Sequence, residues 1–132
     1  MKARNQCIMW LVMIGVYGIK ACRTPGIEDI AAPTVAILSP AAFAVFQSQD
    51  SIPYHIQLAD NDLLHDVHLI VREADTGFLR LSEIAHPHAD TMTFSGTFAL
   101  ETKEPLDFTL RVEASDHHEN LVEQEITFSV HP

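Results

Sequence analysis

The chain has 132 residues, enough for one ordinary domain, and 47% of them are hydrophobic, which is sufficient for a core. Its 18 acidic residues outnumber its eight basic ones, so the net charge at pH 7 is −10 with the eight histidines neutral. So acidic a surface repels the phosphates of nucleic acids, and we set nucleic-acid binding aside.

The first 21 residues have the pattern of an export signal. Lys2 and Arg4 form a basic start, and an unbroken apolar run extends from Cys7 to Ile19. A membrane-spanning helix needs roughly 20 apolar residues, so this shorter run fits the core of a signal peptide better. We therefore expect residues 1–21 to be a signal peptide, with an uncleaved N-terminal anchor as the alternative.

The segment Ile19-Lys20-Ala21-Cys22 resembles a bacterial lipobox, which implies cleavage before Cys22 and lipidation of its sulfur. Ordinary cleavage nearby, with Cys22 incidental, is the alternative. The lipobox resemblance implies a lipoprotein of the bacterial cell envelope, held by its lipid at the outer membrane or in the periplasm. Since Cys7 lies in the signal, the folded part has no disulfide, thiolate metal site or cysteine nucleophile. Beyond the signal, five basic residues against 18 acidic ones give a charge of −13.

Residues 22–33 combine Pro, Gly, acids and alanines without periodicity and predict a flexible tether. From residue 34 onward apolar residues alternate with a period of two, which predicts strands. The predicted strands cover 34–38 (continued at 43–46), 51–59, 66–73, 78–81, 91–100, 106–114 and 121–130. The alternation in 106–114 is the cleanest and predicts that Phe108, Leu110 and Val112 are buried on a central strand.

About seven strands in roughly 100 residues, with no helix, predict an all-β, seven-stranded antiparallel immunoglobulin-like β-sandwich over 34–132. A small barrel is the alternative. The stretch Val112-Glu113-Ala114-Ser115-Asp116, continued to Asn120, resembles the last hairpin of bacterial Ig-like and cadherin-like modules (V-x-A-x-D-x-x-G-N), with Glu119 where Gly is usual. Residues 58–64 resemble the exit of their second strand.

The order of anchor, short tether and histidine-rich sandwich is similar to an uncharacterised family of Bacteroidota lipoproteins, a domain of unknown function. The resemblance covers about 34–130. It implies a fold and little about function, because sandwiches host many tasks.

The sequence motifs of common enzymes are missing. There is no G-x-S-x-G elbow or glycine-rich phosphate loop, and His118-Glu119 begins an H-E-x-x-H pattern that Val122 breaks. The run Asp60-x-Asp62 starts like an EF-hand but continues without its glycine and final glutamate. We therefore expect the chain not to be an enzyme but a non-catalytic binding or interaction module with a protein partner at the envelope.

Glycan binding is disfavoured for lack of aromatic platforms. The one Trp, Trp10, and one of the two Tyr, Tyr17, lie in the signal.

Histidines supply the alternative function. Successive loops of a sandwich alternate between its two ends, which gathers loops 60–65, 82–90 and 115–120 at one end. Neutral imidazole is the commonest metal ligand, and a zinc site takes about four donors. His86 and His88, two apart on an extended chain, would chelate together, joined by one of the adjacent His117 and His118. The candidate metal residues are His86, His88, His117, His118, His65, Asp60, Asp62 and Asp116.

A binding module requires no cofactor, whereas the alternative predicts Zn or Cu at this end of the sandwich. Calcium at Asp60, Asn61, Asp62 and Asp116, which offer the oxygen ligands that calcium takes, is a further option and ranks behind Zn or Cu. We expect His55 and His68 to be ordinary half-exposed residues on strand faces.

Overall fold

Seven strands follow one another in the computed structural model, which describes residues 30–132. They are β1 (Thr34–Ser39), β2 (Val45–Gln47), β3 (Ile52–Glu73), β4 (Leu79–Ala85), β5 (Ala89–Phe98), β6 (Leu106–Asp116) and β7 (Leu121–His131). These residues contain no helix, so none that could cross a membrane. The predicted signal peptide, the lipobox with Cys22 and most of the tether lie outside the described residues.

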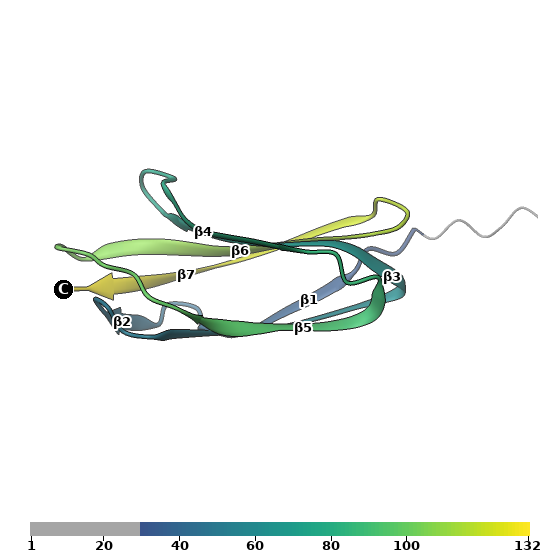
Figure 1. The fold of residues 1–132 in the computed structure, drawn as a ribbon. Coiled ribbons are helices and arrows are strands. Elements are labelled where there is room, and N and C mark those ends of the chain that lie inside the picture. Colours follow the sequence, from purple (N-terminus) through teal and green to yellow (C-terminus); the bar gives the residue numbers. More distant parts are fainter. Residues whose placement is uncertain (1–29) are drawn as a thin grey trace, which may run out of the picture.

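The long strand β3 organises the domain. Its 22 residues would extend over about 70 Å if straight, so it bends, and Figure 1 shows it turning at the end of the molecule near its label. Its first half pairs with β1 and β5, and its second half pairs with β4 and β6. One continuous hydrogen-bonded sheet thereby folds into two layers, with β7 beside β6 and β2 beside β7.

The core lies between these layers and follows the alternation of the sequence. Ile52, Ile56 and the ring of Tyr54 face inward from the first half of β3, against Phe108 of β6 and Phe128 of β7. The rings of Phe108 and Phe128 stack with their centroids 5.7 Å apart. Phe108, Leu110 and Val112 are all fully buried, which confirms the prediction of a central strand in this part of the chain.

The all-β prediction with seven strands is confirmed, but three details differ. The arrangement is not wholly antiparallel, because β2 runs parallel to β7 while the other pairs are antiparallel. The physical reason is that β2 continues β1 in the same direction after crossing to the other layer. The predicted loop 60–65 is part of the continuous β3, and β4 extends through much of the predicted loop 82–90, leaving only 86–88 as connection.

Candidate metal centre

The end of the domain where β3 bends carries five histidines. We call it the histidine pole and define it by His65, His86, His88, His117 and His118. The three chain segments that form it are the bend of β3, the connection from β4 to β5 and the turn from β6 to β7. In each segment a local departure from regular β structure places one of these histidines, namely His65, His88 or His117.

His65 occupies a β-bulge. The register of β3 against β6 shifts between Leu64, which pairs with Asp116, and Asp66, which pairs with Ser115. Leu64 and Val67 are both fully buried although they are three residues apart, so one extra residue separates two inward positions. A bulge of this kind turns a side chain out of the regular alternation and is common beside functional sites.

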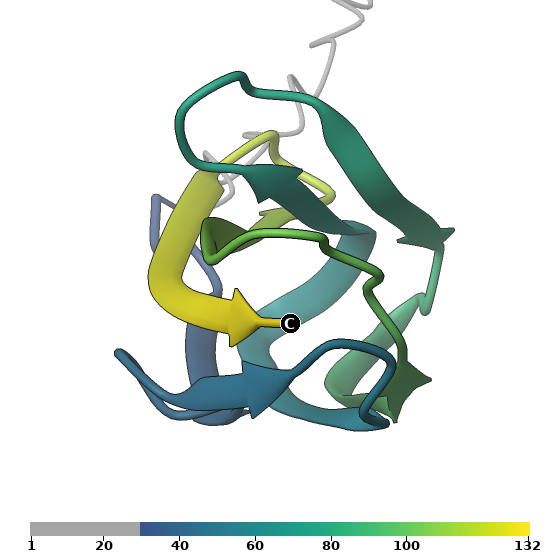
Figure 2. The same ribbon diagram turned by 90° about the vertical axis from the view of Figure 1, so that its left-hand side faces the viewer.

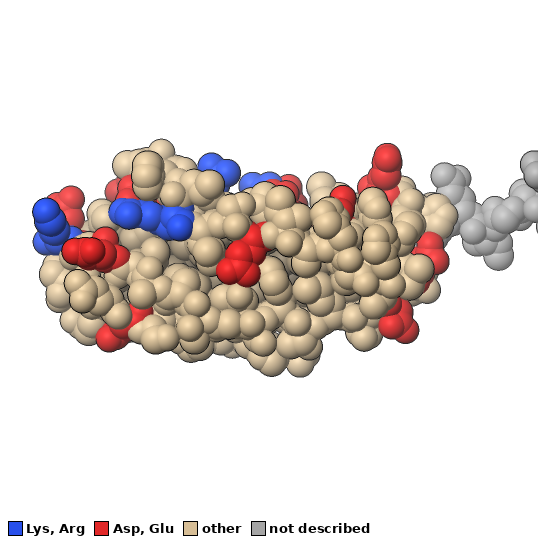
Figure 3. Space-filling view, in the orientation of Figure 1, with Lys and Arg blue, Asp and Glu red and all other residues tan. Residues whose placement is uncertain are grey.

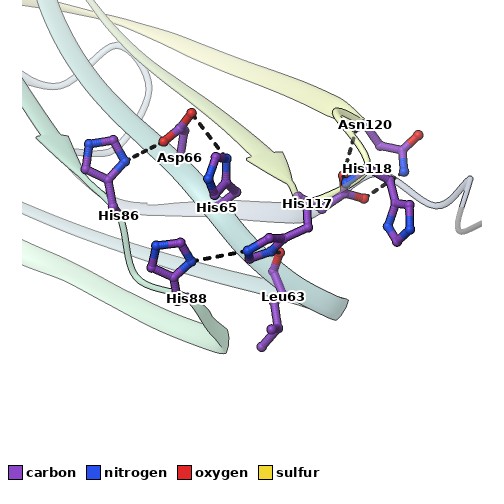
Figure 4. A network of polar contacts seen from close by, with 9 residues as sticks. Leu63, His65, Asp66, His86, His88, His117, His118 and Asn120 are labelled. Carbon is purple, nitrogen blue, oxygen red and sulfur yellow. Dashed lines mark hydrogen bonds and ion pairs between the residues drawn. The ribbon is translucent and has the colours of Figure 1, made fainter.

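His88 stands at the end of the β4–β5 connection with a positive φ of 46°. This left-handed conformation is unusual for a residue with a side chain, although histidine adopts it more readily than most. Two residues share a face only while the chain between them is extended. The turn at His88 therefore separates its side chain from that of His86, and Figure 4 shows the two rings engaged with different partners.

His117 opens the β6–β7 turn, directly after Asp116. The side chain of Asp116 is only 1% exposed and accepts hydrogen bonds from the backbone N–H groups of His118 (2.7 Å) and Asn120 (2.9 Å). It also accepts one from the Asn120 side-chain amide at 2.7 Å. Burial by itself would raise the pKa of Asp116, but these hydrogen bonds outweigh it and hold the pKa below its usual value. The carboxylate thus fixes the turn that presents His117.

His65, His88 and His117 form a compact cluster. One ring nitrogen from each lies within 4.8 Å of the other two, and Nδ1 of His88 is 3.2 Å from Nε2 of His117. The ring centroids are 5.4 Å apart for His65 and His88, 4.8 Å for His65 and His117, and 5.2 Å for His88 and His117. No other group of three histidine, cysteine or acidic residues in 30–132 meets the same distance condition.

These distances suit a tetrahedral metal ion. With metal–nitrogen bonds of about 2.0–2.1 Å, two ligand nitrogens lie about 3.3 Å apart and their ring centroids about 5 Å apart. The observed distances between ring centroids therefore already match those of a tetrahedral site. So does the 3.2 Å distance between the nitrogens of His88 and His117. The nitrogen of His65 lies within 4.8 Å of the other two, so it has to move inward by up to about 1.5 Å. Rotation of a half-exposed side chain allows this movement.

For two members of this cluster, His117 and His65, the other ring nitrogen contacts a protein group. Nδ1 of His117 donates to the backbone carbonyl of Leu63 at 3.2 Å, so its Nε2 accepts a hydrogen bond from Nδ1 of His88, and a cation would take the place of that proton. Nδ1 of His65 lies 3.5 Å from a carboxylate oxygen of Asp66, which leaves its Nε2. Such contacts behind a metal ligand orient the ring and raise its basicity.

Asp66 also holds His86, whose Nδ1 is 2.5 Å from its second oxygen. The other pole histidine, His118, lies 3.0 Å from the carboxylate of Asp62. Asp62 is in turn tied to Asp60, since its backbone N–H donates to Oδ2 of Asp60 at 3.0 Å. His86 and His118 are thus paired with acids beside the cluster and lie outside it (Figure 4).

The charges around the pole favour a cation. The basic residues of the described part are Arg72, Arg80, Lys103 and Arg111, and all belong to the body and far end of the domain. On the face shown in Figure 3, the charged residues toward the pole, at the right-hand end of the domain, are acidic. Clefts and ends lined by charges of one sign raise the local concentration of ions of the opposite sign.

The predicted site residues therefore separate into two sets. The structure brings His65, His88 and His117 together, but does not bring His86, His118, Asp60, Asp62 or Asp116 into the same cluster. The expected chelation by His86 and His88 is not seen, because the backbone at His88 leaves the extended conformation. Asp116 is unsuited to calcium, since N–H groups occupy its oxygens. Sequence reasoning missed Asp66, whose role depends on the bulge beside it.

Comparison with known proteins adds a likeness of fold. No protein-family model matches the chain, and no curated protein sequence is significantly similar to it. Among solved structures, a variant of the superoxide reductase (neelaredoxin) from Ignicoccus hospitalis is 12% identical, with 75% of this chain covering 81% of that one at a TM-score of 0.53. Another structure of that reductase is 13% identical over the same shares, with a TM-score of 0.48.

This finding corrects the expectation that the chain is not an enzyme. At 12% identity the likeness shows the fold alone, yet the solved structure that shares this fold is that of an enzyme. Absence of hydrolase and kinase motifs was therefore no ground for excluding catalysis, because a metal centre needs only a few donors brought together by the fold.

Proposed function

We propose that this domain binds a transition-metal ion at the histidine pole through His65, His88 and His117. The observation that carries the proposal is the approach of three ring nitrogens to within 4.8 Å, from three separate segments of the chain. The bulge at His65, the left-handed backbone of His88 and the capped turn at His117 all direct their rings to one point.

The donor set favours zinc or copper over calcium. Imidazole nitrogens suit Zn²⁺ and Cu²⁺, whereas Ca²⁺ takes six to eight oxygen ligands. Three protein ligands leave the fourth position of a tetrahedral ion open, as in catalytic rather than structural zinc sites. His88 and His117 are exposed, so that position is accessible to water or a small molecule.

The test is metal binding by protein purified without an affinity tag and stripped with a chelator. We expect one Zn²⁺ or Cu²⁺ per chain by calorimetry and metal analysis. An ion present at a hundred times its dissociation constant adds about 2.7 kcal/mol to the stability of the native state, a clear rise in melting temperature. Protons compete with metal for imidazole, so the rise should be much smaller at pH 5 than at pH 7.5.

Substitutions identify the ligands. His65→Ala, His88→Ala and His117→Ala should each abolish the rise, while His55→Ala, a histidine of the first half of β3, should leave it unchanged. His86→Ala should weaken binding without abolishing it, because His86 contacts Asp66 and not the cluster. If neither metal binds the wild type or changes its melting temperature at pH 7.5, the histidines are solvated side chains and the proposal is wrong.

Reduction of superoxide is a second candidate, supported by the fold shared with a superoxide reductase together with an exposed centre that has an open position. It ranks second because the acidic surroundings repel an anion. Protein loaded with a redox-active ion such as copper or iron would have to consume superoxide in the presence of a reductant. His117→Ala should then lose that activity. If the same amount of free metal consumes superoxide equally fast without the protein, this candidate function is wrong.

We further propose that the domain is immunoglobulin-like and is held at the cell envelope by lipid on Cys22. The two-layered arrangement of β-strands supports the first part, and the lipobox resemblance supports the second. The wild type isolated from bacterial membranes should carry a lipid mass on Cys22 and partition into detergent, and Cys22→Ala should carry none. An unmodified Cys22 in protein from those membranes would contradict the anchor.

A further inference from the structure

Strand β5 is an open edge of the sheet. It pairs with the first half of β3 and with no other strand in residues 30–132. From Thr91 to Phe98 the pairing proceeds without a register shift, so the backbone is regular over this length. In Figures 1 and 2 β5 runs along the outer side of its layer. A regular edge strand presents a row of unpaired N–H and C=O groups to any other strand.

The other edges carry the features that discourage such pairing. β4 contains Arg80 and Glu83 and has a register shift against β3 at Arg72, and β1 has a shift before Ser39. β2 has only three residues. β5 has ten residues, no proline and no lysine or arginine, and its one charge is Asp90 at the start. Natural proteins protect edges with charges, bulges or short strands, so the unprotected edge of β5 indicates a partner strand.

The sequence of this edge is nearly symmetric about Phe94. Residues 91–97 read T-M-T-F-S-G-T, so an antiparallel copy centred on Phe94 places Thr91 opposite Thr97 and Thr93 opposite Ser95. These exposed hydroxyl side chains form favourable cross-strand pairs. On the opposite face Met92 lies opposite Gly96 of the copy. In this register Asp90 lies opposite Phe98 of the copy, so the two Asp90 carboxylates do not face each other. Direct repulsion at the interface is thereby avoided in a chain with a net charge of −10.

We propose that two copies of this chain associate through β5, antiparallel and centred on Phe94, so that the sheet continues from one molecule into the next. Such an interface is isologous and closes on itself, as most dimers do. Met92, Phe94 and Phe98 point toward the core but remain partly exposed at the edge, and the second strand covers them. Main-chain hydrogen bonds between the strands supply the specificity of strand addition.

Packing through the face of this layer fits less well than pairing through its edge. The outer face of β1, β3 and β5 is hollowed by a shallow depression of about 410 Å³ that includes Ala36, Gln57 and Thr93. Two such hollows placed together would enclose a void, and voids forfeit packing contacts. The edge has no such obstacle.

The proposed dimer leaves both histidine poles open. His88 precedes β5, six residues from Phe94, so the two copies of His88 lie at opposite ends of the joined strands. At about 3.4 Å per residue their separation is about 40 Å. Association through β5 therefore does not depend on metal, and its failure and the failure of the proposed metal function are separable.

The experiment is sedimentation equilibrium on the full chain in non-ionic detergent with EDTA present, which prevents association through metal. We expect a reversible monomer–dimer equilibrium for the wild type. The double variant Thr93→Asp/Ser95→Asp places carboxylates directly opposite one another in the proposed register and should weaken the dimer about tenfold or more. Thr93→Lys/Ser95→Asp instead places opposite charges across the interface and should restore it.

The matched control adds the same two carboxylates one strand away. His55 and Gln57 of β3 pair with Ser95 and Thr93, so His55→Asp/Gln57→Asp lies on the same face but not at the edge. It should leave the dimer intact, and circular dichroism must show all variants folded. A wild type that stays monomeric to about 1 mM overturns the proposal. So does equal weakening by the control, which would indicate packing through the face, or failure of the Lys/Asp variant to restore the dimer.

Discussion

Asp116 connects the stability of the domain to its candidate metal centre, and its removal should affect both. Its buried carboxylate accepts two backbone N–H groups and the Asn120 side-chain amide within 2.9 Å. Hydrogen bonds to a charged acceptor contribute about 1.5–3 kcal/mol each. In Asp116→Ala the freed donors of the exposed turn recover part of this from water, so we expect a net loss of about 3 kcal/mol. That is a large fraction of the 5–15 kcal/mol typical of a domain.

The loss should depend on pH in a defined direction. The pKa of Asp116 in the folded protein is lowered below its ordinary value, since hydrogen bonds from Asn120 and His118 outweigh the effect of burial. A carboxyl group with a depressed pKa contributes stability that is fully present above its unfolded pKa, about 3.9, and is lost as the pH falls through the folded value. The difference between wild type and Asp116→Ala should therefore be full at pH 7 and shrink below pH 4.

Urea unfolding followed by circular dichroism at pH 7 and at pH 3 measures this difference. The matched control is Asp75→Ala, an exposed acid in the turn between β3 and β4, which should change the stability by no more than about 0.5 kcal/mol. Asp116→Ala should also weaken Zn²⁺ binding, because the turn no longer holds His117 in place. A loss below about 1 kcal/mol at pH 7, or one that does not vary with pH, would refute the reasoning.

Two further predictions concern the core. Phe108→Ala should cost about 3–5 kcal/mol by urea unfolding, because the ring is fully buried and stacks on Phe128; a loss below about 1 kcal/mol would contradict it. Gly96→Ala should cost about 1–3 kcal/mol, because the new Cβ would lie 2.6 Å from the hydroxyl oxygen of Tyr54, which is held by Glu83; a stability equal to that of the wild type would show that the ring can shift without cost.

The strands were predictable because the information for them is local. An inward face every second residue, as in Leu106–Asp116, is visible without knowing what it packs against. The bend of β3 was not predictable, because Asp60, Asn61 and Asp62 have the composition of a loop. They are polar because the strand passes the end of the domain there, where side chains meet solvent. The apolar phase does record the bulge, since it changes from even positions at Ile56 to odd positions at Val67.

The gathering of histidines at one end could likewise be foreseen, because the alternation of loops follows from strand order. The sequence does not show which of these histidines form the cluster. Spacing alone joined His86 to His88, and the backbone conformation of a single residue separates them. Proline at position 87 restrains His86 to extended backbone but leaves His88 free to turn. Selection among neighbouring histidines thus depends on φ at one position, which composition and periodicity do not determine.

The irregular backbone of the pole is itself an argument for function. A two-layered β domain of this size needs only turns at its ends, yet here a bulge, a histidine with positive φ and a turn capped by a buried carboxylate occur in three different segments. Non-glycine residues in sparsely populated conformations cost of the order of 1 kcal/mol and persist where the surrounding structure holds them. Three independent departures would be expected to scatter their side chains. Instead they bring one ring nitrogen from each of three imidazoles within 4.8 Å of the other two. A metal ion requires this arrangement, whereas the folding of the domain does not.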